Sequence, residues 1–300
     1  MIKKYLPRIR FFRELIDSLH RILSHIIQLE NNQSIMKQEF EYKIQEAQNN
    51  HAIQLLQLRS FYTDLVDNNF QRKQKINDPI KKIVPKPFEE YLIDLEKLSP
   101  QVFPVWKQCF DEGTSSYFEE KDHSCSTWSN QYSVAFRSFV ASYAKGRLLD
   151  QGCGMYGLPT YLEGYPEHLI SAIEPLDPVV PINFEIVKGF AEFLPWPDST
   201  FATIVNATSL DHVLCLETAI NESHRVLSKN GLFLIWIASI KGAEPFNKNK
   251  YPIKSIDKYH LFHFEDKWFE NLIINQFTII EKLVFPTPSF AHVFYALRRN

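Results

Sequence analysis

The spacing of apolar residues changes along the chain near Pro79. Before that residue, apolar side chains recur every three or four positions, as at Met36, Phe40 and Ile44, and no glycine interrupts the pattern. This spacing is typical of amphipathic helices. It predicts a helical region over residues 1–78, formed either as a coiled coil or as a helical hairpin.

From residue 126 onwards, short apolar runs alternate with stretches of helical spacing. Such alternation predicts a mostly parallel sheet with helices on both faces, so residues 126–300 should form one doubly wound α/β domain. The last two runs are joined by the short sequence Phe-Pro-Thr-Pro-Ser and should therefore pair antiparallel. The seven expected strands are 147–150, 169–173, 184–187, 201–206, 232–238, 278–284 and 292–297, and the expected helices are 130–144, 216–227 and 265–274.

Residues 79–125 connect these two regions. Prolines punctuate the first part, around a short helical stretch at 89–98. The segment 106–118 is rich in aromatic residues, and we interpret it as a lid or cap. Substrate pockets are often built by the least regular segments, here 106–128 and 241–264.

Composition narrows the class of protein. The 300 residues are 45% apolar and 23% charged, with a formal net charge of −2, so no basic surface favours nucleic acid as a partner. The four cysteines are scattered, which supports neither a disulfide framework nor a zinc site and predicts a reduced, cytoplasmic compartment. No apolar run approaches the roughly 20 residues that span a bilayer.

Two hypotheses remain open for the N-terminal helical region. We favour a role in packing or in forming a homo-oligomer. The alternative is peripheral attachment to an anionic membrane, because basic and aromatic residues alternate between Lys3 and Arg13.

The strongest chemical signal is the stretch Leu148–Gly157, which contains a G-x-G-x-x-G spacing at the end of a predicted strand. Alone, this spacing also fits a tight turn or a dinucleotide-binding protein. Asp150 at the end of the strand can pair with a cationic amino group. Glu174, at the tip of the next strand, is placed to accept hydrogen bonds from ribose hydroxyls.

Further motifs follow in order, namely Ala-Glu-Phe-Leu-Pro-Trp-Pro-Asp-Ser-Thr-Phe over 191–201, Asp-His-Val over 211–213 and Arg-Val-Leu-Ser-Lys-Asn-Gly over 225–231. With the glycine-rich stretch, they make residues 146–238 resemble the small-molecule, type 11-like branch of the class I S-adenosylmethionine-dependent methyltransferases. The resemblance implies a Rossmann-like methyltransferase fold and S-adenosylmethionine as the cofactor.

The same resemblance implies a role for each matching residue. Asp150 and the turn Gly152-Cys153-Gly154 would hold the methionine end of the cofactor, and Glu174 would bind the ribose. Pro175, Ala191 and Glu192 would lie at the adenine, and Asn206 beneath the sulfonium. The sequence departs from the family at Phe190, where an aspartate is common, and in the prolines that break the second helix.

Asp211 and His212 are the candidate catalytic residues. A hydroxyl acceptor loses a proton during methyl transfer, and a histidine can take it near neutral pH. The alternative is that His212 caps a helix or packs against the cofactor. These residues favour methyl transfer to oxygen of a small-molecule or glycan-like acceptor.

His260 and His263 have a spacing that allows metal binding, but no nearby acid or cysteine completes a set of ligands. We therefore interpret both histidines as part of a wall on the substrate side and predict no metal site.

Two other functions stay open for the chain. One is a scaffold whose methyltransferase-like domain has lost its cofactor. The other is an NAD(P)-dependent oxidoreductase, against which Asp150 argues because a carboxylate there would repel a pyrophosphate.

Overall fold

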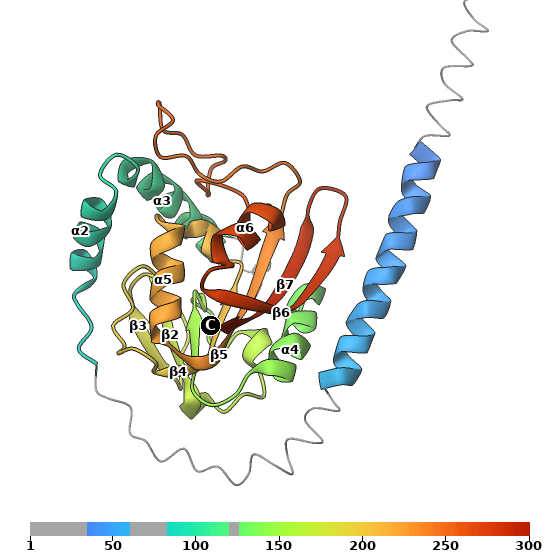
Figure 1. Cartoon of the computed structure of the whole chain (residues 1–300), viewed down its shortest axis with the longest axis horizontal. Helices are drawn as coiled ribbons and strands as arrows, with labels where there is room; N and C mark the ends of the chain where they lie inside the picture. The colour runs from blue at the N-terminus through green and yellow to red at the C-terminus, as the bar shows by residue number, and fades with distance from the viewer. Residues whose placement is uncertain (1–34, 61–82, 120–125) are drawn as a thin grey trace, which may run out of the picture. The chain divides into compact units, whose positions relative to one another are not determined.

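The computed structural model describes residues 35–60, 83–119 and 126–300 (Figure 1). Residues 35–60 form a helix, as the apolar spacing predicts. The remaining part of the predicted N-terminal helical region, including the basic segment between Lys3 and Arg13, lies outside the described residues. Among those described, no helix combines the length and apolar character that a membrane crossing needs.

A seven-stranded sheet with the order β3-β2-β1-β4-β5-β7-β6 forms the centre of the fold. The strands are β1 (Leu148–Gln151), β2 (Ile170–Glu174), β3 (Glu185–Lys188), β4 (Phe201–Ala207), β5 (Leu227–Ser239), β6 (Phe277–Pro286) and β7 (Ala291–Arg299). Strands β1 to β5 run parallel, whereas β7 pairs antiparallel with both β5 and β6. The predicted doubly wound, mostly parallel sheet with an antiparallel C-terminal pair is confirmed.

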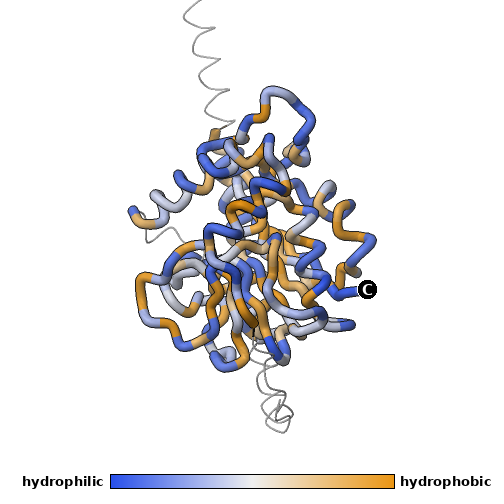
Figure 2. Tube along the Cα trace, turned by 90° about the vertical axis from the view of Figure 1, so that its left-hand side faces the viewer, coloured by the Kyte–Doolittle hydropathy of each residue, from blue (hydrophilic) through white to orange (hydrophobic). Residues whose placement is uncertain are grey.

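Helices cover both faces of this sheet. They are α2 (Phe88–Leu98), α3 (Phe103–Glu119), α4 (Gln131–Tyr143), α5 (Leu216–Val226) and α6 (Asp266–Ile273). Consecutive strand residues serve opposite faces: Leu149 belongs to the core that includes residues of α2, α3 and α5, whereas Leu148 belongs to the core that includes residues of α4. Figure 1 shows α4 on the side away from α2, α3 and α5, and Figure 2 shows apolar residues concentrated along the central strands.

Local sequence explains where the elements begin and end. The side chain of Asn130 accepts hydrogen bonds from the backbone N–H groups of Tyr132 and Ser133, which caps the start of α4. No helix forms over residues 175–184 between β2 and β3, as the prolines there predict. Strand β5 begins earlier than expected, because Leu227 already pairs with Phe201 ahead of a register shift.

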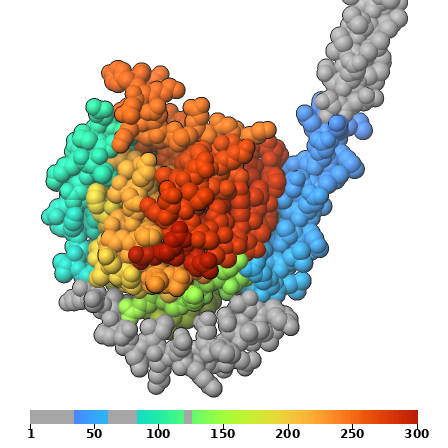
Figure 3. Space-filling view, viewed as in Figure 1, coloured from blue at the N-terminus to red at the C-terminus, as the bar shows by residue number. Residues whose placement is uncertain are grey.

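The loop over residues 240–264 lies beside α3 (Figure 3). An ion pair between Lys258 of the loop and Glu112 of α3, 3.0 Å apart, joins them at the surface. This loop and α3 are the segments from which the sequence predicts the substrate pocket.

Candidate functional site

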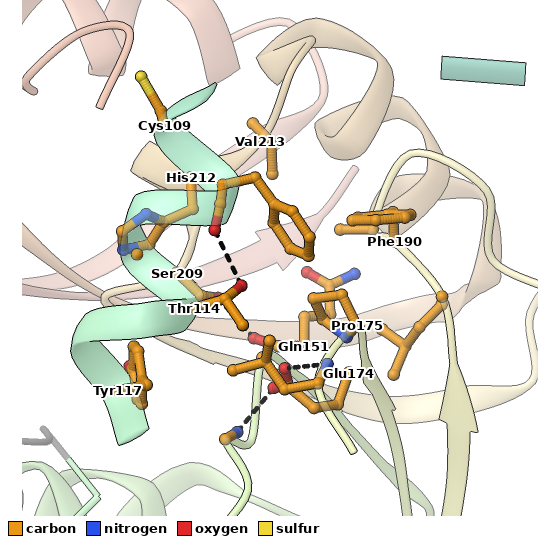
Figure 4. A pocket seen from close by; sticks show the side chains of 18 of the residues that line it. Cys109, Thr114, Tyr117, Gln151, Glu174, Pro175, Phe190, Ser209, His212 and Val213 are labelled. Carbon is orange, nitrogen blue, oxygen red and sulfur yellow. Dashed lines mark hydrogen bonds between the residues drawn. The ribbon is translucent and has the colours of Figure 1, made fainter. Parts of the chain in front are cut away.

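A pocket that is open to solvent lies at the carboxyl ends of β1 and β2. Strand order reverses between β1 and β4, and ligands of such sheets bind at this reversal. One wall comes from strand ends and carries Gln151 and Glu174, while the other comes from α3 and carries Thr114 and Tyr117 (Figure 4). The pocket therefore combines a sheet wall with a helix wall.

The glycines of the turn after β1 have different roles. Gly152 and Gly154 both have positive φ, of 84° and 75°, which strains any other residue. A Cβ on Gly152 would lie only 2.4 Å from Oγ of Ser209, so this glycine permits the close approach of β1 and the loop after β4. A Cβ on Gly154 would meet nothing within 4 Å, so this glycine leaves open space in the pocket.

Glu174 lines the pocket and is almost completely buried. Its Oε2 accepts a hydrogen bond from the backbone N–H of Gly154 at 2.7 Å, and its Oε1 accepts one from Leu176 at 3.0 Å. Burial raises the pKa of this carboxyl to about 7, although the two backbone donors oppose the shift. Glu174 thus fixes the glycine turn and keeps unused lone pairs on both oxygens.

Asp150 is fully buried and does not line the pocket. Both of its oxygens accept from the hydroxyl of Tyr161, at 3.1 and 3.3 Å, and burial raises its pKa to about 8. Cys153 is also buried outside the lining, and burial raises its thiol pKa well above the usual value. Both side chains therefore sit beneath the glycine turn rather than in the pocket. No motif or apolar spacing in the sequence points to Tyr161 as the partner of Asp150.

Asn206 is buried at the end of β4 and also stays outside the lining. Its Nδ2 donates to the backbone carbonyl of Gln151 at 3.2 Å, and its Oδ1 accepts from the N–H of Ser209 at 3.3 Å. The hydroxyl of Ser209 donates to the same Gln151 carbonyl at 2.6 Å. These bonds join the ends of β1 and β4, and they place Gln151 and Ser209, which we did not predict, in the pocket.

Pro175, Ala191 and Glu192 all line the pocket, and Pro175 directly follows Glu174 in the chain. The buried carboxylate of Glu192 accepts from the backbone N–H groups of Leu214 and Cys215, at 2.7 and 3.2 Å. Burial raises its pKa to about 7. Glu192 thereby anchors the segment that follows β4.

The helix wall is built largely by aromatic residues. Phe190 stacks on Phe88 with ring centroids 5.4 Å apart, and meets Trp106 and Phe110 edge-on at 5.5 and 5.7 Å. The aromatic residue at this position, where the family often has an aspartate, therefore packs against α2 and α3. The hydroxyl of Tyr156 in the glycine loop donates to the carbonyl of Tyr117 at 2.6 Å, which ties α3 to the turn.

The predicted catalytic residues lie in a short 3-10 helix, Leu210–His212, after β4. His212 lines the pocket, and its backbone carbonyl accepts from Nε1 of Trp106 at 2.8 Å. Burial lowers the pKa of the His212 imidazole, so the neutral form predominates at pH 7. Asp211 is partly buried outside the lining, and its Oδ2 is 3.9 Å from Nε2 of His260.

The sequence interpretation of His260 and His263 was wrong in one respect, because an acid does lie beside them. Asp257 has both oxygens 2.9 Å from Nδ1 of His260, and its Oδ2 is 3.1 Å from Nε2 of His263. The imidazole of His260 lies next to that of His212, with ring centroids 4.5 Å apart. The structure thus gathers three histidines and two aspartates at one end of the pocket.

A family model described as "Methyltransferase domain" matches residues 149–235, which contain the glycine turn, Glu174, Glu192 and His212. The chain therefore contains a domain of the class I S-adenosylmethionine-dependent methyltransferases. This confirms the resemblance found in the sequence, including the type 11 branch, and with it methyl transfer as the activity and S-adenosylmethionine as the cofactor.

Solved structures similar to this methyltransferase include other methyltransferases. One is a 1,6-didemethyltoxoflavin-N1-methyltransferase from Burkholderia thailandensis with S-adenosylhomocysteine bound, at 15% identity and a TM-score of 0.48, covering 73% of this chain and 94% of that one. Another is the N-methyltransferase NodS from Bradyrhizobium japonicum, at 12% identity and a TM-score of 0.45, covering 62% and 98%. No curated protein matches this methyltransferase.

Proposed function

We propose that this methyltransferase transfers a methyl group from S-adenosylmethionine to an oxygen atom of a small-molecule or glycan-like acceptor. The observation that supports the proposal most is that one pocket carries the glycine turn and Glu174 as well as His212. A cofactor held at the turn and an acceptor held at His212 would therefore share one cavity.

The residues of the sheet wall fit the cofactor. The space beside Gly154 admits a ligand close to the backbone, and the Glu174 carboxylate can accept hydrogen bonds from two ribose hydroxyls. Pro175 and Ala191 would bound the adenine site next to Glu174. When bound, S-adenosylmethionine supplies an electrophilic methyl group on its sulfonium.

Four of the residues that were predicted to bind the cofactor would instead hold other parts of the site in position. Asp150, with its partner Tyr161, and Cys153 would support the glycine turn from beneath, and Asn206 would hold Gln151 and Ser209 in place. Glu192 would fix the segment that leads from His212 into α5. We therefore propose these four as positioning residues.

His212 and Asp211 would serve the acceptor. A hydroxyl oxygen becomes a better nucleophile when its proton is removed, and His212 is neutral at pH 7 because burial lowers its pKa. A neutral imidazole can promote this ionisation in two ways, by accepting the proton or by holding a cation that binds the oxygen. Both ways make His212 necessary for turnover.

The test is to incubate the purified protein with methyl-deuterated S-adenosylmethionine and a panel of phenols, sugars and amines, and to detect labelled products by mass spectrometry. We expect labelled methyl ethers, and a loss of about 100-fold or more in turnover for His212→Ala. His224→Ala is the matched control, since His224 lies on α5 against Phe277, outside the pocket lining. Labelled amines alone would contradict transfer to oxygen, and normal turnover of His212→Ala would remove its proposed role.

The helix over residues 35–60 supports a second proposal, a homo-oligomer formed through this region. Met36, Phe40 and Ile44 recur every four residues and are exposed, by 68%, 66% and 44%. A second copy of the same helix would cover such an apolar stripe. Light scattering should show an oligomer that Phe40→Glu dissociates, and a monomeric wild type would contradict the proposed oligomer.

Membrane contact, a cytoplasmic location and the domain boundaries at 78 and 125 stay predictions.

A further inference from the structure

Three side chains at the acceptor end of the pocket bring potential metal ligands together. Asp211, His212 and His260 each offer one oxygen or nitrogen atom, and these atoms all lie within 4.8 Å of one another. They come from two segments, since Asp211 and His212 follow β4 while His260 belongs to the loop between β5 and α6. The fold, rather than sequence proximity, assembles this group.

The orientation of His260 is fixed by Asp257. Nδ1 of His260 is 2.9 Å from the carboxylate oxygens, and Oδ1 of Asp257 is itself held by the backbone N–H groups of Tyr259 and His260, at 2.7 and 2.8 Å. A carboxylate that accepts from Nδ1 places the ring proton there and leaves the lone pair on Nε2. Metal-ligating histidines almost always donate their other N–H to a carboxylate or carbonyl in this way.

Asp211 supplies an independent observation. Its Oδ1 is buried and has no hydrogen-bond partner among the residues that the structure describes. Its Oδ2 is 3.9 Å from Nε2 of His260, too far for a hydrogen bond. Buried carboxylate oxygens without a partner are costly and rare, and a bound cation would satisfy this one.

We propose that Asp211, His212 and His260 bind one divalent transition-metal ion beside the methyl-transfer pocket. Two imidazoles and a carboxylate suit zinc and related ions such as cobalt, and three protein ligands leave coordination positions open. The ligand atoms need to move inward by side-chain rotation to reach metal–ligand distances of about 2 Å.

The role of the ion rests on the proposed function. His212 lines the pocket, so an ion held by it lies where the acceptor hydroxyl would bind. The hydroxyl oxygen would occupy an open position, and its O–H bond would break with loss of the proton to water, because a divalent ion lowers the pKa of a bound hydroxyl. Under this proposal the ion ionises the acceptor, and His212 holds the ion.

In a neighbouring group, Asp257 with His260 and His263, the potential ligand atoms also lie within 4.8 Å of one another. We assign the ion to the Asp211 group because Oδ1 of Asp257 already accepts from two backbone donors and from His260. The two assignments share His260 but differ in the other residues, so substitutions distinguish them. Asp211→Asn tests the first group and His263→Gln the second.

The experiment uses the purified full-length protein, treated with a chelator and then titrated with Co²⁺ and Zn²⁺. We expect one equivalent of Co²⁺ to give visible absorption bands and Zn²⁺ to displace it, with binding followed by calorimetry. Asp211→Asn and His260→Gln should raise the dissociation constant for Co²⁺ by at least about 100-fold. Asp257→Asn should raise it by about 10- to 100-fold, as is found for other residues that orient a metal ligand. His263→Gln should leave it within about twofold.

Two results would overturn the inference: no binding by the wild type, or binding that His263→Gln abolishes and Asp211→Asn preserves. Circular dichroism and S-adenosylhomocysteine binding of each variant check that it is folded. The methyl-transfer assay is independent of the metal titration, so the two proposals can fail separately. Cobalt binding without labelled products would contradict the proposed function alone, and labelled ethers from chelator-treated protein would contradict the ion's role alone.

Discussion

The two walls of the pocket are built on different principles. The sheet wall is held by backbone hydrogen bonds to buried carboxylates: Glu174 accepts from Gly154 and Leu176, and Glu192 accepts from Leu214 and Cys215. The helix wall has few such bonds and is held mainly by ring packing around Phe190.

This difference indicates which ligand each wall of the pocket is suited to bind. Hydrogen bonds to fixed backbone groups set geometry closely, so the sheet wall suits a constant ligand such as the cofactor. Aromatic packing depends on shape and tolerates substitutions of similar volume. The helix wall therefore suits the acceptor, which differs from one enzyme to another. Substitutions on the two walls should therefore have separable effects.

The largest expected effect is on the sheet wall. Glu174→Gln should weaken S-adenosylhomocysteine binding by about 100-fold, about 2.7 kcal/mol, because hydrogen bonds from hydroxyls to a carboxylate are stronger than those to a neutral amide. The wild-type affinity should also rise between pH 6 and pH 8 as Glu174, with its pKa near 7, ionises. Calorimetry across this range checks both, and a variant that keeps wild-type affinity would show that Glu174 does not hold the ribose.

A slightly smaller effect concerns stability. The pKa of Glu192 is about 7 in the folded protein, above its usual value of 4.5, so the folded state retains a proton that the unfolded state loses. This contribution to the free energy of unfolding is therefore present at low pH and is lost as the pH rises from about 4.5 to about 7. Between pH 5 and pH 8 the loss should amount to roughly 2 to 3 kcal/mol.

Urea unfolding of the wild type and of Glu192→Gln at these two pH values isolates that contribution. The amide of the variant can still accept from Leu214 and Cys215. Asp150 and Glu174 titrate in both proteins, so only the difference between the two proteins reports Glu192. Equal pH dependence in both would contradict the raised pKa.

The smallest predicted effect lies on the helix wall. Gly113 of α3 lines the pocket, and a Cβ there would meet nothing within 4 Å. Gly113→Met should stabilise α3, since glycine costs up to about 1 kcal/mol in a helix, and should place its side chain in the cavity. We expect a higher melting temperature with roughly tenfold weaker acceptor binding, about 1.4 kcal/mol, and unchanged S-adenosylhomocysteine binding.

Gly113→Ala is the matched control, because it gains helix stability without filling the pocket. If both variants bind as the wild type does, α3 does not bound the working site. If both bind more weakly to the same extent, the effect comes from the helix and not from the volume added.

Some features of the fold and of the pocket could be predicted from the sequence, and others could not. The strands, their antiparallel end, Gly154 and Glu174 could be predicted because apolar alternation and glycine spacing are local signals. Tyr161 as the partner of Asp150, and Ser209 beside Gly152, could not, because these contacts join residues distant in sequence. Asp257 lies only three residues before His260, yet its proximity depends on a turn that apolar spacing does not reveal.

The central claim is that S-adenosylmethionine binds at the carboxyl ends of β1 and β2. Its most direct test is calorimetry of the full-length protein with S-adenosylhomocysteine, with NAD and NADP as controls, for the wild type and for Gly154→Val. We predict micromolar binding, about −8 kcal/mol, of S-adenosylhomocysteine only. The variant should lose this binding, because its side chain occupies the space beside the turn and is strained at positive φ. Binding of NAD or NADP alone, or no binding of any of these ligands, would contradict the claim.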